Sequence, residues 1–501
     1  MGHHLNRRRF LRNLGLGAGA LAAGCVLSSR DAARAKAAPA AGRRPNILFI
    51  MVDDLGKEWI SCCGAEDIKT PHIDALAAGG MRMTSAYSMP QCTPTRVTLL
   101  TGQYPWRTGW TNHWDVPRWG VGYFDWKRHT TVATLLKKAG YATAAAGKWQ
   151  INDFRLTPDA MAKHGFDESC MWTGFESGNP PSGNRYWDAY VHTRAGSKTC
   201  EGKFGPDVYT DFLIDFLKRH KDEPMLLYFP MALTHGPLVH TPDEPDAKSG
   251  LDKHKAMVRY VDKLVGRLVG AIDDLGIRGD TIIIFTTDNG SGGGQAGTRN
   301  GRKVKGGKAK TSENGVCAPF IVNGPGRVPA GAVSDALTDF TDLLPTFAEL
   351  AGAAVPADLK IDGVSIAPVL LGKAKDSPRE WIMALGHGAG TCDEKGVRGN
   401  NAFADRVIRD KRHKVWIDPS RTITRLHDLA ADPYEETNLL SSADAAHVAA
   451  LKKFQAVLDG LPAADARPQY EPRAANPWDR KPAPAKDKAP KKRRGPTKGV
   501  A

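Results

Sequence analysis

The stretch NILFIMVDDLG, residues 46–56, gives the clearest indication of the fold class. Its apolar run has the length and composition of a strand that is buried on both faces, and two carboxylates follow directly. Strands that alternate with helices predict an open, largely parallel α/β sheet. Similar apolar runs occur at 141–146, 225–231, 281–287 and 319–323, and amphipathic helical stretches lie between them at Thr131–Ala139, Val208–Lys221 and Lys255–Leu275.

The pattern changes near residue 395. VIRDKRHKVWI (407–417) and ITRLHDL (423–429) predict antiparallel strands, and Leu451–Leu461 predicts a helix. We therefore expect a main domain at 45–390 and a smaller C-terminal α+β domain at 391–462. Residues 463–501 are rich in Pro, Lys, Arg and Ala, a composition typical of a disordered tail.

The net charge of +15 is concentrated at the two ends of the chain. Residues 1–45 and residues 480–501 each carry a net charge of +8, whereas 46–479 hold 51 basic and 52 acidic residues. A nucleic-acid-binding domain needs a basic surface on its folded body. The even balance of the long middle segment therefore excludes nucleic acid as the partner.

The N-terminus has the order of an export signal, which we place at 1–40. NRRRFLR (6–12) precedes an uncharged stretch at 13–29 and then small-residue sites such as Ala35-Lys36-Ala37. The apolar stretch is too short and too rich in Gly for a stable membrane span. Arg7-Arg8 followed by Phe10-Leu11 is similar to a twin-arginine signal. This predicts export by the twin-arginine translocase to the bacterial periplasm, the cell envelope or the exterior. LAAGC (21–25) differs from a lipoprotein box in the place of its Leu, so lipidation of Cys25 stays open.

Polar side chains follow several of the predicted strands. In open α/β sheets, functional groups gather beyond the carboxyl ends of the strands. Each group alone has an ordinary explanation as a turn or a helix cap, but together they define one edge rich in oxygen ligands. Such ligands suit a hard divalent cation, Ca²⁺ or Mg²⁺. The residues are Asp53, Asp54, Lys148, Gln150, His235, Asp288 and Asn289.

The stretch MPQCTPTRVTLLTG (89–102) leaves four roles open for Cys92: a core thiol, a nucleophile, a metal ligand or a precursor of another group. A helix is predicted to start near Thr93–Thr95, with Pro94 in its first turn. Arg96, four residues after Cys92, projects from roughly the same face. A thiolate is a poor ligand for a hard cation, which indicates that the working group is an oxygen.

The motif Cys92-Thr-Pro94-Thr-Arg96 followed by VTLLTG resembles the signature of the formylglycine-dependent sulfatases of the alkaline-phosphatase superfamily. The similarity continues through PNILFIMVDDLG, TPHIDALAAGGMRMTSAY, TVATLLKKAGYATAAAGKW, TIIIFTTDNG and LHDLAADPYEETNL, and it covers about residues 45–460. It implies an alkaline-phosphatase-like fold, with a large mixed, mostly parallel sheet flanked by helices and a smaller C-terminal antiparallel sheet. It also implies an arylsulfatase-like hydrolase that releases sulfate and an alcohol.

The resemblance assigns roles to individual residues. A maturation enzyme would convert Cys92 to Cα-formylglycine, whose hydrated aldehyde attacks sulfur and whose second hydroxyl then expels sulfate. Arg96 would brace this group, Lys148 and Lys308 would contact the sulfate, and His235 or Lys308 would protonate the leaving oxygen. Lys310 fits the second lysine less well than Lys308. The implied Ca²⁺ ligands are Asp53, Asp54, Asp288, Asn289 and the formylglycine at Cys92.

Two positions depart from the family pattern. Gln150 stands where many relatives have a histidine, so the base for sulfate expulsion is open, with Asp54 as one candidate. Cys317 stands where relatives often carry Arg or His. A Cys170–Cys200 disulfide is compatible with export.

The substrate is open between aryl and carbohydrate sulfates, and its determinants are expected in loops 111–128, 173–206 and 291–307. Alternative functions are hydrolysis of phosphonates or phosphodiesters and non-catalytic binding of sulfated glycans.

Overall fold

A computed structural model describes residues 42–112, 124–172, 174, 176, 179–386, 391–393, 396–398 and 402–467. The export signal expected at 1–40, including Cys25, lies outside these residues, as does the tail beyond residue 467. Within the described part of the chain, no helix has the length and apolar character needed to cross a lipid bilayer.

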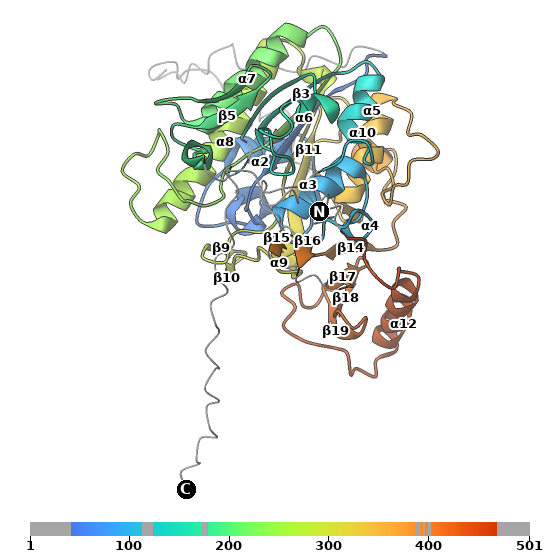
Figure 1. The fold of residues 1–501 in the computed structure, drawn as a ribbon. Helices are drawn as coiled ribbons and strands as arrows, with labels where there is room; N and C mark the ends of the chain where they lie inside the picture. The colour runs from blue at the N-terminus through green and yellow to red at the C-terminus, as the bar shows by residue number, and fades with distance from the viewer. Residues whose placement is uncertain are drawn as a thin grey trace, which may run out of the picture. The chain divides into compact units, whose positions relative to one another are not determined.

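Eleven of the described strands form one large sheet (Figure 1). Along it, hydrogen-bonded neighbours run in the order β12 (Ala332–Ser334), β2 (Met81–Tyr87), β11 (Cys317–Asn323), β8 (Thr281–Thr287), β1 (Asn46–Val52), β7 (Met225–Pro230), β3 (Ala142–Lys148), β4 (Glu168–Trp172), β5 (Tyr190–Thr193) and β6 (Gly196–Thr199), and β13 (Thr338–Asp339) pairs with β2. The central strands from β8 to β4 are parallel. This confirms the expected mixed, mostly parallel α/β class.

One predicted strand has an orientation that the sequence did not reveal. β11 runs antiparallel to both β8 and β2. β2 itself was not predicted, because MRMTSAY lacks a continuous apolar run. The antiparallel placement brings Cys317, the first residue of β11, opposite Tyr87, the last residue of β2. Cys317 therefore lies at the same edge of the sheet as the carboxyl end of β8.

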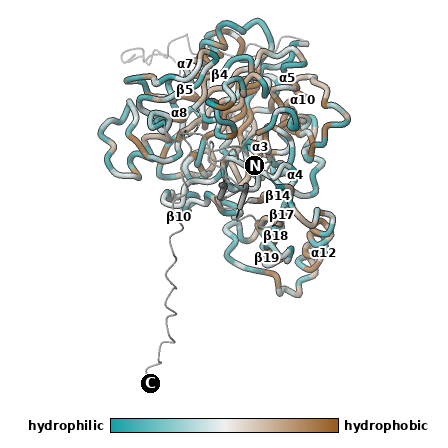
Figure 2. Tube along the Cα trace, in the orientation of Figure 1, coloured by the Kyte–Doolittle hydropathy of each residue, from teal (hydrophilic) through white to brown (hydrophobic). Residues whose placement is uncertain are grey.

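Helices cover both faces of this sheet because both sets of alternating strand residues are apolar. Ile47, Phe49 and Met51 of β1 join a core with α3, α5 and α10, whereas Leu48, Ile50 and Val52 join a core with α2, α7 and α8. Figure 2 shows the apolar residues along the strands and these helices and the polar ones along the outer loops. The helices are α2 (Pro71–Ala78), α3 (Cys92–Thr101), α4 (Pro105–Thr108), α5 (Val132–Lys138), α6 (Ala160–Lys163), α7 (Gly205–His220), α8 (Gly250–Asp274), α9 (Glu313–Val316), α10 (Leu343–Ala351), α11 (Ala367–Leu370) and α12 (Ala445–Asp459).

A second, antiparallel sheet has the order β14 (Ile382–Leu385), β17 (Arg406–Arg409), β18 (His413–Ile417) and β19 (Ile423–Asp428). We call it the C-terminal sheet. β14 precedes residue 391, where the second domain was predicted to begin. Helix α12 packs on this sheet through Ala450, Phe454 and Leu458, and it starts six residues before the predicted helix. Two hairpins complete the fold: β9 (Ala296–Arg299) with β10 (Arg302–Lys305), and β15 (Thr391–Asp393) with β16 (Gly396–Arg398).

Candidate active site

Four acidic or amide residues meet at the carboxyl ends of β1 and β8. The two strands are parallel neighbours with Val52 opposite Thr287, so the residues that follow each strand emerge side by side. The backbone N–H of Asp288 donates to the Val52 carbonyl at 3.0 Å, and the N–H of Asp54 donates to Oδ1 of Asp288 at 3.1 Å. Asp53, Asp54 and Asp288 each place a carboxylate oxygen within 4.8 Å of the others. The sequence prediction that these residues gather at one edge agrees with this geometry.

The oxygen atoms of this cluster fit a hard divalent cation. Oδ1 of Asp53 and Oδ1 of Asn289 are buried and have no hydrogen-bond partner among the described residues. The Asn289 amide N–H₂ donates to Oδ1 of Asp54 at 2.7 Å, which fixes the orientation of the amide. Burial and the neighbouring negative charge of Asp53 raise the pKa of Asp288 well above its usual range. A bound divalent cation would satisfy the two free oxygens and offset this repulsion.

Cys92 opens α3, one residue earlier than the sequence predicted. The side chain is fully buried, and its sulfur lies within 4.8 Å of a ligand atom of Asp53 and of His235. Thr95 holds the start of the helix against β8, because its hydroxyl donates to the Asp288 carbonyl at 2.7 Å. Residue 92 therefore lies at a helix N-terminus, next to the carboxylate cluster and next to a histidine.

Arg96 crosslinks three elements beneath Cys92. Its Nη1 donates to the Lys148 carbonyl at 2.6 Å, and its Nη2 donates to Oδ2 of Asp288 at 3.1 Å. The guanidinium is almost completely buried. Burial opposes its charge, but the nearby phenol of Tyr228 and the carboxylate of Asp288 favour it and raise the pKa of Arg96 above its ordinary value. The permanent charge of Arg96 thus supports the strand ends that surround residue 92.

Two lysines bring positive charge to the carboxylates. Lys148, the last residue of β3, places Nζ 2.5 Å from Oδ2 of Asp53, and Lys308 places Nζ 2.7 Å from Oδ2 of Asp54. Burial disfavours the charge on Lys308, but negative charge at Cys92 and Asp54 outweighs burial and raises its pKa above the usual range. The Lys308 loop is held by backbone bonds, with the Lys308 N–H donating to the Ser291 carbonyl at 3.0 Å.

His235 lies beyond the end of β7 and faces the same cluster. Its Nε2 is 3.7 Å from Oδ2 of Asp54, and its Nδ1 is 3.1 Å from Nη1 of Arg185. Burial and the positive charge of Lys148 lower the pKa of His235 to about 4. Arg185, which stacks on the Trp172 ring at 4.0 Å, was not predicted individually. It lies in the 173–206 loop, and nothing in its local sequence marks it.

Gln150 follows Lys148 by two residues and is buried at the same edge of the sheet. Its backbone φ is +66°, in the left-handed region that few side chains other than Asn, Asp and His favour. Asp54 is already bound to Lys308 and to the Asn289 amide. Gln150 thus lies just after the strand end that carries Lys148, and Asp54 lies within the carboxylate cluster.

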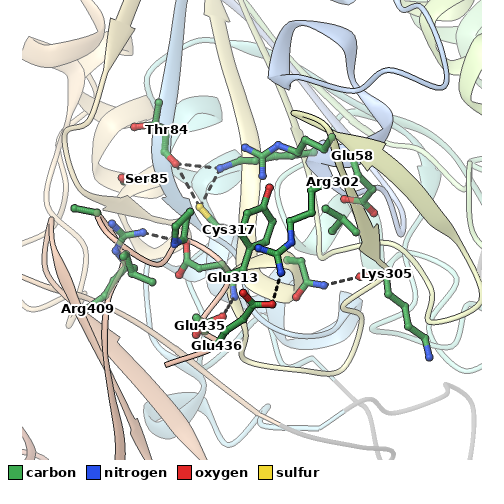
Figure 3. Close-up of a pocket in the computed structure, with 18 of the residues that line it drawn as sticks. Glu58, Thr84, Ser85, Arg302, Lys305, Glu313, Cys317, Arg409, Glu435 and Glu436 are labelled. Carbon is green, nitrogen blue, oxygen red and sulfur yellow. Dashed lines mark hydrogen bonds and ion pairs between the residues drawn. The ribbon is translucent and has the colours of Figure 1, made fainter. Parts of the chain in front are cut away.

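A pocket of about 460 Å³ lies next to this edge of the sheet (Figure 3). Its lining includes Cys317, which lies 3.0 Å from Nζ of Lys57. Arg302 reaches Glu436 and Arg409 reaches Glu313 across the pocket. Among the described residues, positive side chains outnumber negative ones in the lining: Lys57, Arg299, Arg302, Lys303, Lys305, Arg409 and Lys411 against Glu58, Glu313, Glu435 and Glu436.

Other predictions fall partly on residues that are not described. Of the expected substrate loop 111–128, residues 113–123 lie outside the described part of the chain. Cys170 and Cys200 are both free thiols, so the disulfide that export would permit is not formed in the structure.

The mixed sheet and its strand-end site define an enzyme of the alkaline-phosphatase-like α/β class. A family model described as sulfatase matches residues 45–353, and a second, described as the C-terminal part of N-sulphoglucosamine sulphohydrolase, matches residues 308–459. The chain belongs to the sulfatase family. The predicted resemblance is confirmed, and the chain is a sulfuric ester hydrolase of a family that also hydrolyses carbohydrate sulfates.

Individual relatives agree with this assignment. The chain is 33% identical over 480 residues to arylsulfatase A of Homo sapiens, which covers 85% of this chain and 90% of the relative. It is 34% identical over 359 residues to N-acetylgalactosamine-6-sulfatase of Canis lupus familiaris, with 67% of each chain covered. The solved structure of Ps i-CgsB in complex with k-i-k-neocarrahexaose is similar with a TM-score of 0.70, at 25% identity over 86% of this chain and 95% of that one.

Proposed function

We propose that this chain hydrolyses sulfate monoesters after Cys92 has been oxidised to Cα-formylglycine by a maturation enzyme and an external oxidant. The observation that carries the proposal is the position of Cys92, buried at the start of α3 against Asp53 and His235. A structural thiol needs no such surroundings, whereas an oxygen nucleophile at this point would adjoin the carboxylate cluster and both lysines. The net reaction converts a sulfate ester and water into an alcohol, sulfate and a proton.

Asp53, Asp54, Asp288 and Asn289 would hold the divalent cation, with Ca²⁺ preferred over Mg²⁺. When bound, the cation and the hydrated aldehyde would supply Lewis acidity and the nucleophilic oxygen. Lys148 and Lys308 would bind sulfate oxygens and offset the charge that develops on them. His235 would carry the proton at Nε2 for the departing alcohol, with Lys308 as the other donor. Arg96 would fix the position of residue 92 relative to the Lys148 carbonyl.

Carbohydrate sulfates are the favoured substrate class. In the described part of the chain, the pocket shares no lining residue with the candidate active site, but its excess of positive side chains would suit further anionic groups of a larger ligand. The similar Ps i-CgsB structure is in complex with k-i-k-neocarrahexaose, and one relative is named N-acetylgalactosamine-6-sulfatase, which together support a carbohydrate sulfate as substrate. Aryl sulfates would fit the cationic site without using this pocket. An aryl sulfate and an aryl phosphodiester would both suit the same lysines. Measuring the turnover of each therefore distinguishes the sulfatase function from the phosphodiesterase alternative.

The location and the domain division are part of the same proposal. Residues 1–40 would direct export through the twin-arginine translocase to the periplasm or beyond. Residues 45–381 would form the catalytic domain, and β14 together with the predicted segment 391–462 would form the C-terminal α+β domain, with 463–501 as a basic tail.

Mass spectrometry of the proteolytic peptide that contains residue 92 tests the mechanism. Protein produced together with a competent maturation enzyme should carry an aldehyde in place of the thiol, and Cys92→Ala should abolish sulfate release. Cys63→Ala, at another buried cysteine, is the matched control and should retain turnover. An intact thiol at residue 92 in active enzyme, or unchanged turnover of the Cys92→Ala variant, would refute the proposal.

A further inference from the structure

A second group of metal-ligating side chains lies in the C-terminal sheet, which shares no strand with the large sheet that carries the candidate active site. His413, Asp428 and His447 each present a ligand atom within 4.8 Å of the other two. We propose that these three residues bind a Zn²⁺ ion that joins α12 to β18 and β19. The inference is independent of the proposed sulfatase chemistry.

The topology brings the three residues together from well-separated points in the chain. His413 and Asp428 are register partners across the antiparallel pair β18–β19, so their side chains leave the sheet on the same face. His447 lies in the first turn of α12, which packs over these strands. The rings of His413 and His447 meet at right angles, with centroids 5.7 Å apart and an interplanar angle of 84°.

The buried ring of His413 points to a missing ligand. This residue is only 7% exposed, and its Nε2 has no hydrogen-bond partner among the described residues. Buried polar atoms are almost always satisfied by protein, water or an ion, and the neighbouring Asp428 and His447 make an ion the favoured partner at His413. A metal ion between His413 and His447 would use the free lone pair directly.

The ring of His447 is oriented as a metal ligand requires. Its Nδ1 lies 2.8 Å from the Ser442 hydroxyl. When Nδ1–H donates to this oxygen, the neutral ring keeps its Nε2 lone pair for a metal. Imidazole ligands in metal sites are commonly fixed by such a partner on the other ring nitrogen. Ser442 is therefore a positioning residue in the proposed site.

Two imidazoles and one carboxylate match the donor preference of Zn²⁺ rather than that of Ca²⁺. Tetrahedral Zn²⁺ places neighbouring ligand atoms about 3.4 Å apart, so atoms within 4.8 Å need small side-chain rotations to close around it. Water would complete the coordination.

Arg412 competes for the site, because its Nε and Nη2 donate to Oδ2 of Asp428 at 2.9 and 2.7 Å. Its side chain is 58% exposed, so the guanidinium can turn to solvent when a metal takes its place.

Metal analysis of the full chain tests the site. The protein is stripped with chelator, saturated with excess Ca²⁺ to occupy the oxygen-rich active site, and then titrated with Zn²⁺. We expect one Zn²⁺ per chain and a rise of about 2–5 °C in the unfolding temperature. Ser442→Ala should weaken Zn²⁺ binding by roughly 10-fold. Arg412→Gln should strengthen it, since the competing cation is gone.

His447→Gln and His413→Ala remove ligands and should abolish stoichiometric Zn²⁺ binding. The matched control is His427→Gln, a buried histidine of the same sheet that lies outside the cluster. It should bind Zn²⁺ as the unmodified chain does. His447 is only half-buried, so His447→Gln keeps the test decisive if His413→Ala fails to fold. Equal Zn²⁺ binding by His447→Gln and the unmodified chain, or no Zn²⁺ binding by the unmodified chain, would overturn the proposal.

Discussion

The ammonium of Lys148 lies 2.5 Å from a carboxylate oxygen of Asp53, and both side chains are fully buried. Burial disfavours the Asp53 charge, but the positive charges of Lys148 and Arg96 outweigh it and hold the pKa of this carboxyl below its usual range. Asp53 is therefore held in its ionised form beside the Lys148 ammonium. Its two members come from the ends of β3 and β1, strands that are separated by β7.

Replacement of Lys148 by Met should remove the nearest positive partner of the buried Asp53 carboxylate and leave Arg96, 3.6 Å away, as its remaining ion pair. Loss of one member of a buried pair costs about 3–5 kcal/mol of unfolding free energy. Urea unfolding in the presence of chelator measures this cost, and added Ca²⁺ should reduce it because the cation replaces the missing positive charge. Exposed Lys198→Met is the control and should change little. An equal cost with and without Ca²⁺ would show that no cation adjoins Asp53.

Replacement of Gln150 by His should introduce a titrating group beside the nucleophile position. The left-handed backbone at residue 150 tolerates His better than most residues, so the fold should persist. The pH profile of kcat should gain an inflection at about 6.5, the ordinary pKa of an imidazole. Gln150→Ala should lower kcat without adding this inflection. Identical pH profiles for Gln150→His and the unmodified enzyme would exclude residue 150 from the proton transfers.

Replacement of Lys303 by Ala should weaken binding of multiply sulfated substrates. Lys303 lines the positively charged pocket and is exposed, so its removal takes away charge without disturbing the core. We expect KM for a sulfated oligosaccharide to rise about 2–5-fold, the effect of one solvent-screened contact. In the Lys303→Ala variant, KM for an aryl sulfate should stay constant. In the control variant Lys198→Ala, KM should stay constant for both substrates. An equal rise in KM for both substrates would show that the pocket does not bind the additional sulfates of the oligosaccharide.

Replacement of Glu313 by Gln should change the dependence of stability on pH. Glu313 accepts hydrogen bonds from Arg409 and Lys414, both at 3.1 Å. Burial opposes its charge, but Lys414 and Arg409 lower the pKa of Glu313 from 4.5 to about 2. Because the folded pKa is depressed, the carboxylate stabilises the fold above pH 4.5. This stability is lost as the pH falls from 4.5 towards 2.

Unfolding free energies measured between pH 6 and pH 3 check this expectation. Glu313→Gln should be less stable than the unmodified chain at pH 6, on the order of 3 kcal/mol, and the difference should shrink at lower pH. Exposed Glu349→Gln provides the control. A difference that does not vary with pH would contradict the assignment.

The buried strands and the polar residues at their ends could be predicted from the sequence, because both depend on local composition. The run at 46–52 and the Asp53-Asp54 pair are adjacent in the chain, so strand and ligands are predicted together. The antiparallel direction of β11 was not, since PFIVN has the same apolar pattern in either orientation. Arg185 and the His413–His447 pair were not predicted from the sequence, for a related reason. Their neighbours come from distant loops and strands, and no spacing rule connects them.

The links from Glu313 to the C-terminal sheet also set an order of assembly. Glu313 begins α9, five residues after Lys308, and it accepts a hydrogen bond from the Tyr87 hydroxyl of the large sheet. Its other partners, Arg409, Lys414 and Glu435, follow it by 96, 101 and 122 residues. A ribosome must therefore release the last strands before Glu313 gains its final contacts. A chain shortened at residue 390 would retain every side chain of the candidate active site and the backbone bond from Lys308 to Ser291, but it would lack the ion pairs of Glu313 with Arg409 and Lys414. The charge of Glu313 is therefore compensated only at the end of synthesis.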